Sequence, residues 1–161
     1  MEITYHPIGV IHSPFTDLKQ MPIQPTGRSS APGTVEVFSE FAEGLKDLGG
    51  FSHLILVYHF HQSRQVTLTV TPFLDSAPRG LFATRAPTRP NPIGISIIEL
   101  VSIKANILQI ANLDILDGTP LLDIKPYVPD FDRPAAARVG WLEETRQNLK
   151  STHSDVRFVS G

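Results

Sequence analysis

The stretch Gly80-Leu-Phe-Ala-Thr-Arg-Ala-Pro-Thr-Arg-Pro-Asn-Pro-Ile-Gly-Ile-Ser96 places three prolines and two arginines directly before the longest apolar run that predicts a strand. Proline fixes φ and lacks a backbone N–H donor, so these residues exclude a helix and a paired central strand. We therefore predict a stiff loop over residues 84–92, called the proline loop below, that leads into a strand over residues 93–103.

The proline loop lies in a segment whose charged residues are all positive. Between Asp75 and Glu99 the chain carries Arg79, Arg85 and Arg89 and no acidic residue. A preorganised cationic loop suits an anionic ligand or a nucleic-acid backbone. The same pattern also suits a rigid connector with solvated arginines, and local chemistry leaves both interpretations open.

Composition limits the class of protein. The chain has 161 residues, of which 41% are hydrophobic and 19% charged, with a net charge of −2 and no cysteine. These values predict a single domain over residues 1–161 of a cytoplasmic protein that does not associate with membranes. Disulfides and cysteine-ligated zinc are excluded, and the net charge disfavours non-specific nucleic-acid binding by the whole surface.

The pattern of turns and apolar residues favours a β-rich fold. Fourteen prolines and eleven glycines are spread along the chain. The predicted strands cover residues 2–11, 34–38, 51–60, 66–71, 93–103, 106–113, 121–125 and 155–159. Residues 104–105 and the pair Asp117-Gly118 are predicted turns. The pattern predicts a mostly antiparallel barrel or sandwich and, lacking any G-x-G-x-x-G or Walker loop, disfavours a Rossmann or P-loop fold.

Two short helices are predicted beside these strands. Helical spacing relates Phe41, Leu45 and Leu48, with Ser39 as N-cap and a stop at the glycine that follows. The second helix is predicted to begin at residues 132–134 and to continue through residues 141–149.

Three histidines share odd parity around one predicted strand. His53, His59 and His61 would face one side of an extended segment. Histidines in this pattern are metal ligands in some barrels, but no carboxylate follows before Asp75. We therefore expect these side chains to bond to protein or phosphate-type groups, and we predict no metal site.

A third cluster follows the predicted hairpin. Asp114, Asp117, Asp123, Lys125 and Tyr127 fall within one turn and its flanking strands. A turn at Asp117-Gly118 accounts for Asp117, and the other charged groups could be surface caps. A charged pair inside a strand next to proline gains little structurally, which favours a functional role.

Several motifs together resemble one known family. They are the stretch from Gly80 to Ser96, Phe51-Ser-His-Leu54, His59-Phe-His-Gln62 and Asp117-Gly-Thr-Pro-Leu-Leu-Asp-Ile-Lys-Pro-Tyr127. They are similar to the TsaA-like (TrmO-type) family over about residues 5–132. Residues 133–161 form a C-terminal part of the same predicted domain, beyond this resemblance. Members are S-adenosylmethionine-dependent tRNA methyltransferases that act on N6 of threonylcarbamoyladenosine, 3′ of the anticodon. The resemblance implies a compact β-barrel, neither Rossmann-type nor knotted, that dimerises and binds the donor near the subunit interface.

The resemblance also implies a set of site residues. The S-adenosylmethionine site would comprise Gln24, Pro25, Gln62, Ser63, Arg85, Ile95, Asn112, Leu113 and Asp114. Asp123 or Tyr127 would accept the proton that leaves the acceptor nitrogen. Arg79, Arg89 and Lys125 would hold phosphates of the tRNA anticodon loop.

Two other functions fit the same residues. The chain could methylate another nucleoside or a small molecule, or it could be a non-catalytic module that binds adenosylmethionine or RNA. Products on free nucleosides would distinguish the first of these, and intact binding without turnover the second.

Overall fold

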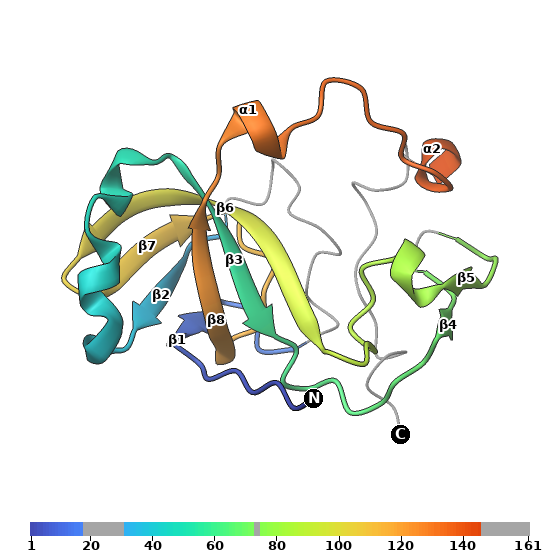
Figure 1. Ribbon diagram of the computed structural model, residues 1–161, viewed down its shortest axis with the longest axis horizontal. Coiled ribbons are helices and arrows are strands. Elements are labelled where there is room, and N and C mark those ends of the chain that lie inside the picture. The colour runs from blue at the N-terminus through green and yellow to red at the C-terminus, as the bar shows by residue number, and fades with distance from the viewer. Residues whose placement is uncertain (18–30, 73–74, 146–161) are drawn as a thin grey trace.

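Six strands close into an antiparallel barrel in the computed structural model, which describes residues 1–17, 31–72 and 75–145 (Figure 1). Around the barrel the order is β1 (Gly9–His12), β2 (Gly33–Val37), β7 (Ile107–Ala111), β6 (Ile93–Lys104), β3 (His53–His59) and β8 (Thr119–Pro126), which pairs with β1 again. Every one of these pairings is antiparallel. The predicted fold class, mainly β with a compact, mostly antiparallel barrel and two short helices, is confirmed.

Alternating side chains fill the barrel. Along β3, Leu54, Leu56 and Tyr58 are buried, whereas the residues between them are half-buried on the outer face. The interior is completed by inward apolar residues of the other strands and of the segment before β8: Ile11, Val35, Val37, Ile98, Leu108, Ile110, Leu113, Ile115 and Leu121. The period-2 pattern of each strand therefore places one face in the core and the other at the surface.

The strand that follows the proline loop connects both halves of the barrel. β6 pairs with β3 from Ile93 to Glu99 and with β7 from Glu99 to Lys104. The predicted hairpin is confirmed: Ala105 takes a φ of 54°, and the Asn106 side-chain amide donates to the Val37 carbonyl at 2.7 Å. The proline loop is thus fixed to the longest strand of the sheet.

Two predicted strands are shorter than expected. The first begins at Gly9 instead of residue 2. The strand predicted over residues 66–71 is reduced to β4 (Thr69–Val70), which pairs only with β5 (Arg79–Gly80). The backbone groups before β4 bond to loop residues instead of to a strand. The Thr67 N–H donates to the Thr88 carbonyl, and the Leu68 carbonyl accepts the Leu81 N–H.

The first predicted helix lies at the expected residues but is 3₁₀ in type. Residues 39–50 form two 3₁₀ turns, η2 (Ser39–Leu45) and η3 (Leu48–Gly50), because Asp47 adopts a left-handed φ of 65° between them. Ser39 caps nothing: Phe38 is the N-cap residue, without a side-chain cap bond.

The C-terminal helix also differs from its prediction. Asp132 ends α1 (Pro129–Asp132) instead of starting a helix, and its carboxylate accepts the Val128 N–H at 2.7 Å. Pro134 cannot continue α1, and the next helix, α2 (Leu142–Thr145), lies within the predicted residues 141–149, of which 146–149 are outside the described residues. The strand predicted over residues 155–159 lies outside the described residues.

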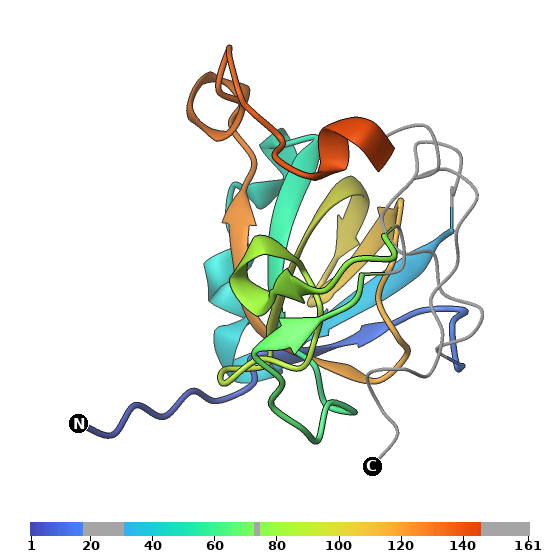
Figure 2. The same ribbon diagram turned by 90° about the vertical axis from the view of Figure 1, so that its right-hand side faces the viewer.

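A small lobe lies beside the barrel in Figure 1 and faces the viewer in Figure 2. It consists of β4, β5 and the 3₁₀ turn η4 (Leu81–Ala83). The Trp141 indole N–H donates to the Ala83 carbonyl at 2.8 Å, so the chain before α2 is joined to this lobe. Among the described residues, no helix has the length and apolar character required to cross a membrane.

Candidate functional site

A part-buried carboxylate, that of Asp114, contacts the barrel wall just after β7. Asn112 turns the chain with a φ of 61°, and the buried Leu113 and Ile115 anchor the segment on either side of Asp114. The Ser96 hydroxyl of β6 donates to Asp114 Oδ1 at 2.7 Å. The segment between β7 and β8 therefore brings a charged group against the inner side of β6.

A second hydroxyl completes this contact. Tyr58 Oη lies 3.1 Å from Ser96 Oγ, and Tyr58 and Ser96 are only 6% and 3% exposed. The Tyr58 ring packs edge-on against Phe60, with 5.5 Å between centroids. Sequence reasoning missed Tyr58 and Ser96; the signal available was a serine at an inward position of an otherwise apolar strand.

Electrostatics single out Asp114. Burial raises the pKa of Asp114 to about 6, while the Ser96 hydrogen bond, the Asp114 backbone amide and the charge of Arg85 act in the opposite direction. Burial also raises the pKa of Tyr58 well above its usual range, so its hydroxyl stays protonated. The structure thus brings Asp114 and Arg85, both predicted donor ligands, within electrostatic reach of each other.

The proline loop is held by contacts with its own carbonyls. Arg89 Nη1 donates to the Thr84 carbonyl at 3.0 Å and to the Ala86 carbonyl at 3.4 Å, and the guanidinium lies 5.6 Å from the centroid of the exposed Phe82 ring. The Ser63 hydroxyl donates to the Pro87 carbonyl at 2.9 Å. The loop after β3, which carries two predicted donor residues, is therefore joined to the proline loop.

The other predicted donor residues are more scattered. Gln62 is exposed beside Ser63, and the Asn112 amide donates to Glu99 at 3.2 Å. Leu113 is wholly buried, and its backbone N–H donates to the Ala31 carbonyl. Ile95 is 50% exposed on the outer face of β6, opposite to Ser96. Gln24 and Pro25 lie outside the described residues.

The predicted proton acceptors lie on the outer face of the barrel. Asp123 pairs in register with Val57 and binds Lys125 Nζ at 2.7 Å. Tyr127 follows β8 and contacts the His53 ring edge-on, with 6.3 Å between centroids. Within one copy of the chain, the β3 wall therefore separates these residues from the inward hydroxyls of Tyr58 and Ser96.

Arg79, the remaining predicted RNA ligand, is engaged in the small lobe. Its guanidinium contacts Asp75 Oδ2 at 2.6 Å and lies 5.5 Å from the centroid of the Trp141 ring. The partner carboxylate neutralises much of its charge.

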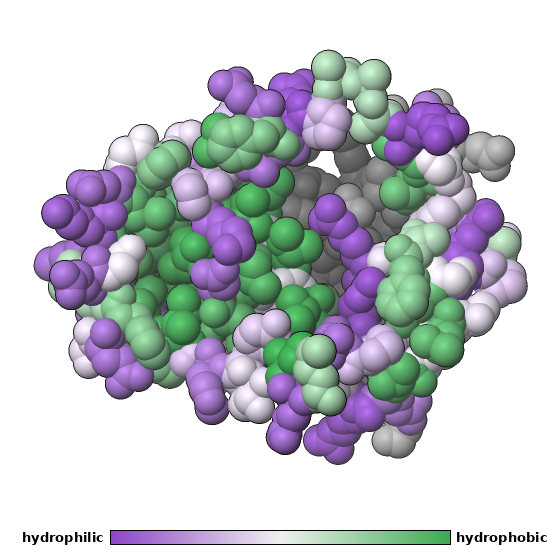
Figure 3. All heavy atoms as spheres, viewed as in Figure 1, coloured by the Kyte–Doolittle hydropathy of each residue, from purple (hydrophilic) through white to green (hydrophobic). Residues whose placement is uncertain are grey.

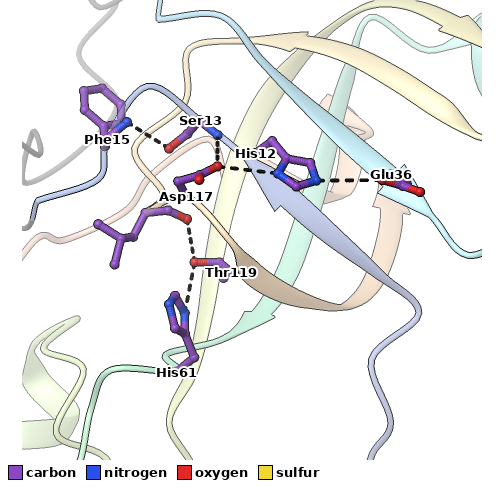
Figure 4. A network of polar contacts seen from close by, with 8 residues as sticks. His12, Ser13, Phe15, Glu36, His61, Asp117 and Thr119 are labelled. Carbon is purple, nitrogen blue, oxygen red and sulfur yellow. Dashed lines mark hydrogen bonds and ion pairs between the residues drawn. The ribbon is translucent and has the colours of Figure 1, made fainter.

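A polar network joins β1 to the turn before β8 (Figure 4). The predicted Asp117-Gly118 turn is present, with Gly118 at a φ of 74°, and Asp117 accepts the Ser13 N–H at 3.0 Å. His12 lies 3.5 Å from the same carboxylate oxygen and 3.8 Å from Glu36. Asp117 therefore has a structural role in closing the barrel.

The three histidines that were predicted to share one face lie apart from one another in the structure. His53 and His59 occupy the two ends of β3 on its outer face, whereas His61 follows the strand, with Nδ1 3.4 Å from Thr119 Oγ1. Partial burial and the neighbouring His59 lower the pKa of His61. Across the described residues, no group of three histidines, aspartates, glutamates or cysteines is arranged to hold a metal ion.

Fold and site together define a closed antiparallel barrel in which a part-buried carboxylate lies within electrostatic reach of a cationic loop. Residues 10–133 match the family model of the tRNA-methyltransferase O N-terminal domain. The chain belongs to this family, as its motifs predicted.

Relatives support the assignment. A probable S-adenosyl-L-methionine-binding protein of Pyrococcus abyssi is 56% identical over 98% of this chain and 86% of its own length. The tRNA (adenine(37)-N6)-methyltransferase of Escherichia coli is 38% identical over 78% of this chain and 57% of its own length. The crystal structure of TrmO from Pseudomonas aeruginosa superposes with a TM-score of 0.75 at 40% identity, covering 88% of this chain and 63% of that one. The chain therefore spans less than two thirds of the last two proteins.

Proposed function

We propose that this chain is a cytoplasmic S-adenosylmethionine-dependent tRNA methyltransferase that methylates N6 of threonylcarbamoyladenosine 3′ of the anticodon. The observation that carries the proposal is the part-buried Asp114 carboxylate, which accepts from Ser96 and whose pKa the positive charge of Arg85, on the proline loop, helps to lower. Its support is the chemistry of this pair together with the family, whose members include a named S-adenosylmethionine-binding protein and a named tRNA methyltransferase.

The residues present fit the methyl donor. Adenosylmethionine carries a carboxylate that an arginine binds well and ribose hydroxyls that a carboxylate accepts from. In this proposal Arg85 binds the donor carboxylate and Asp114 the ribose. The seven other donor residues of the prediction contribute backbone groups, amides and an apolar surface: Gln24, Pro25, Gln62, Ser63, Ile95, Asn112 and Leu113.

The donor supplies an activated methyl group, and the chain must align the acceptor with it. Attack by N6 forms the N6–carbon bond as the sulfur–carbon bond breaks, and N6 loses a proton. Alignment dominates the rate of such a displacement. Asp123 and Tyr127 remain our candidate proton acceptors; their position on the outer face requires a site shared with a second copy of the chain.

The outer face of β3 and β6 supports a homodimer. Ile93, Ile95 and Ile97 are 37%, 50% and 44% exposed, and the register places the half-buried Ile55 and Val57 beside Ile97 and Ile95. Figure 3 shows hydrophobic side chains gathered over these strands. We call these five residues the outer apolar face. A contiguous apolar patch of this kind marks an interface, and a two-fold axis would pair it with itself.

An Ile97→Glu variant tests the dimer. A charge within the outer apolar face should shift the chain from dimer to monomer in sedimentation velocity, with little loss of monomer stability because Ile97 is already 44% exposed. A wild-type chain that sediments as a monomer would exclude this interface.

The RNA contacts of the proposal rest mainly on Arg89. Asp75 and Asp123 neutralise Arg79 and Lys125, whereas Arg89 bonds only to neutral carbonyls in its described contacts and keeps its full charge. Phe82, 75% exposed beside that guanidinium, offers a ring for stacking with an unpaired base. Arg79 and Lys125 are weaker candidates for phosphate contacts.

The decisive assay mixes the purified chain, labelled donor and tRNA that carries threonylcarbamoyladenosine, followed by mass spectrometry of the digested tRNA. We expect a methyl group on the modified adenosine. Arg85→Ala should weaken donor binding by about 1.5–3 kcal/mol, the range for a charge-assisted hydrogen bond. Arg64→Ala is the matched control, since Arg64 is an exposed arginine outside the predicted site. Donor binding without any product on tRNA would contradict the proposal, and methylation of free nucleosides would favour the small-molecule alternative.

A further inference from the structure

A phenol and a serine hydroxyl lie in line behind the Asp114 carboxylate. Tyr58 Oη is 3.1 Å from Ser96 Oγ, which is 2.7 Å from Asp114 Oδ1. Tyr58 belongs to the apolar cluster that fills the barrel, where phenylalanine would pack equally well without a polar atom to satisfy. The phenol hydroxyl therefore needs a reason other than packing.

The direction of the two hydrogen bonds gives a reason for the phenol hydroxyl. A serine hydroxyl has one proton, and an ionised carboxylate only accepts. Because Ser96 donates to Asp114, its oxygen is left to accept, and the donor to it is Tyr58. Both hydroxyl dipoles then point toward Asp114, and each bond strengthens the next.

Gly94 provides the space for this arrangement. A Cβ at Gly94 would overlap the Tyr58 ring and lie 2.9 Å from Phe60 Cζ. Gly94 and Ser96 are successive inward positions of β6, so the Gly-Ile-Ser end of the family motif both admits the phenol and bonds to it. The motif thus builds the support of the carboxylate as well as the proline loop.

We propose that Tyr58 and Ser96 are positioning residues that hold the Asp114 carboxylate in one orientation toward the ribose hydroxyls of the methyl donor, an inference that rests on the proposed donor site. Tyr58 acts only through Ser96, since its ring is buried in the core. In this proposal the other carboxylate oxygen, Asp114 Oδ2, meets the ligand.

The same contact keeps the carboxylate ionised. Ser96 is the largest influence that lowers the pKa of Asp114 against the effect of burial. In the described residues, the charge of Arg85 from the proline loop helps to lower the pKa of Asp114, and the charge of Asp114 in turn helps to raise the pKa of Tyr58 from β3. Without the hydroxyl pair, Asp114 should titrate at a higher pH and bind hydroxyl donors less well at neutral pH.

Two measurements on Ser96→Ala and Tyr58→Phe test the proposal. Carbon NMR of the ligand-free chain follows Asp114 between about pH 4 and pH 8, and calorimetry follows adenosylmethionine binding over the same range. We expect the Asp114 pKa to rise in both variants, most in Ser96→Ala. Donor affinity at neutral pH should fall about threefold to tenfold, with its pH profile displaced upward. Tyr5→Phe, at a 68% exposed tyrosine, is the control and should change neither quantity.

The outcomes separate the two proposals. An unchanged Asp114 titration in Ser96→Ala, or an unchanged affinity and pH profile in Tyr58→Phe, overturns the positioning role. A wild-type chain that does not bind the donor overturns the proposed function, while the ligand-free titration still decides whether the hydroxyls hold Asp114. If Ser96→Ala does not fold, Tyr58→Phe decides alone, because it removes one oxygen and keeps the ring.

Discussion

The wall formed by β3 and its neighbours has one carboxylate on its inner side and one on its outer side, and the two differ in burial and in their partners. On the inner side, Asp114 has a pKa raised to about 6 by burial and is held by a chain of two buried hydroxyls. On the outer side, Asp123 is half-exposed and paired with the exposed Lys125 at 2.7 Å. The strand thus separates Asp114, whose pKa is shifted by its surroundings, from Asp123, which is solvated and paired with a cation.

This difference follows from dielectric environment more than from the number of partners. Water screens the Asp123–Lys125 pair, so the pair contributes little to folding. Asp114 has lost much of its hydration, so each remaining hydrogen bond changes its proton affinity strongly. Perturbation of the inner side should therefore have large effects and perturbation of the outer side small ones.

The largest effect is expected from Gly94→Ala. The added methyl group overlaps the Tyr58 ring, and in the closed barrel neither strand can move away freely. We expect a loss of about 3 kcal/mol in the free energy of unfolding, measured with urea. Gly80→Ala is the matched control, because a Cβ there meets nothing within 4 Å. Equal stability of the two variants would show that the inner side is loosely packed.

A smaller effect is expected from pH. The folded chain keeps the Asp114 proton up to about pH 6, whereas the unfolded chain releases it near 3.8. Between these values the folded state binds more protons, so this group's contribution to the stability of the ligand-free protein falls as pH rises through the window. The loss should be roughly 2 kcal/mol, given about 1.4 kcal/mol per pKa unit and some residual exposure. Asp114→Asn should remove it; an unfolding free energy whose pH profile is the same in both proteins would contradict the assignment.

The sequence predicts what is local and misses what the barrel brings together. Alternation identifies β6 and its hairpin with β7, since period and turn lie within twenty residues. The choice between barrel and sandwich needs the pairings of β8 with β1 and β3, which no local pattern contains. Tyr58 and Ser96 are separated by 38 positions, so their contact is invisible until both strands are in register.

The arginines illustrate the same limit. Charge alone does not distinguish Arg85 from Arg89 in the sequence, and their separate predicted roles come from the family resemblance. In the structure Arg89 bonds to the loop's own carbonyls, whereas Arg85 acts on Asp114 from a segment distant in sequence. Charge can be read from the sequence, but the partner of each charge depends on backbone carbonyls that only the folded loop presents.

The smallest effect is expected from Lys125→Ala on the outer side. Lys125 and Asp123 are 62% and 46% exposed, so removing the cation leaves the carboxylate hydrated and unstrained. Asp123 raises the pKa of Lys125, so the pair's contribution is present at neutral pH and is lost only as pH rises through the lysine's own range. The urea midpoint of Lys125→Ala at neutral pH should therefore stay close to that of the wild type, and high salt should remove the remaining difference. A double-mutant cycle with Asp123→Ala measures the coupling directly. A coupling as large as the effect of Gly94→Ala would mean that water does not reach the outer pair, as happens when a second copy of the chain covers it.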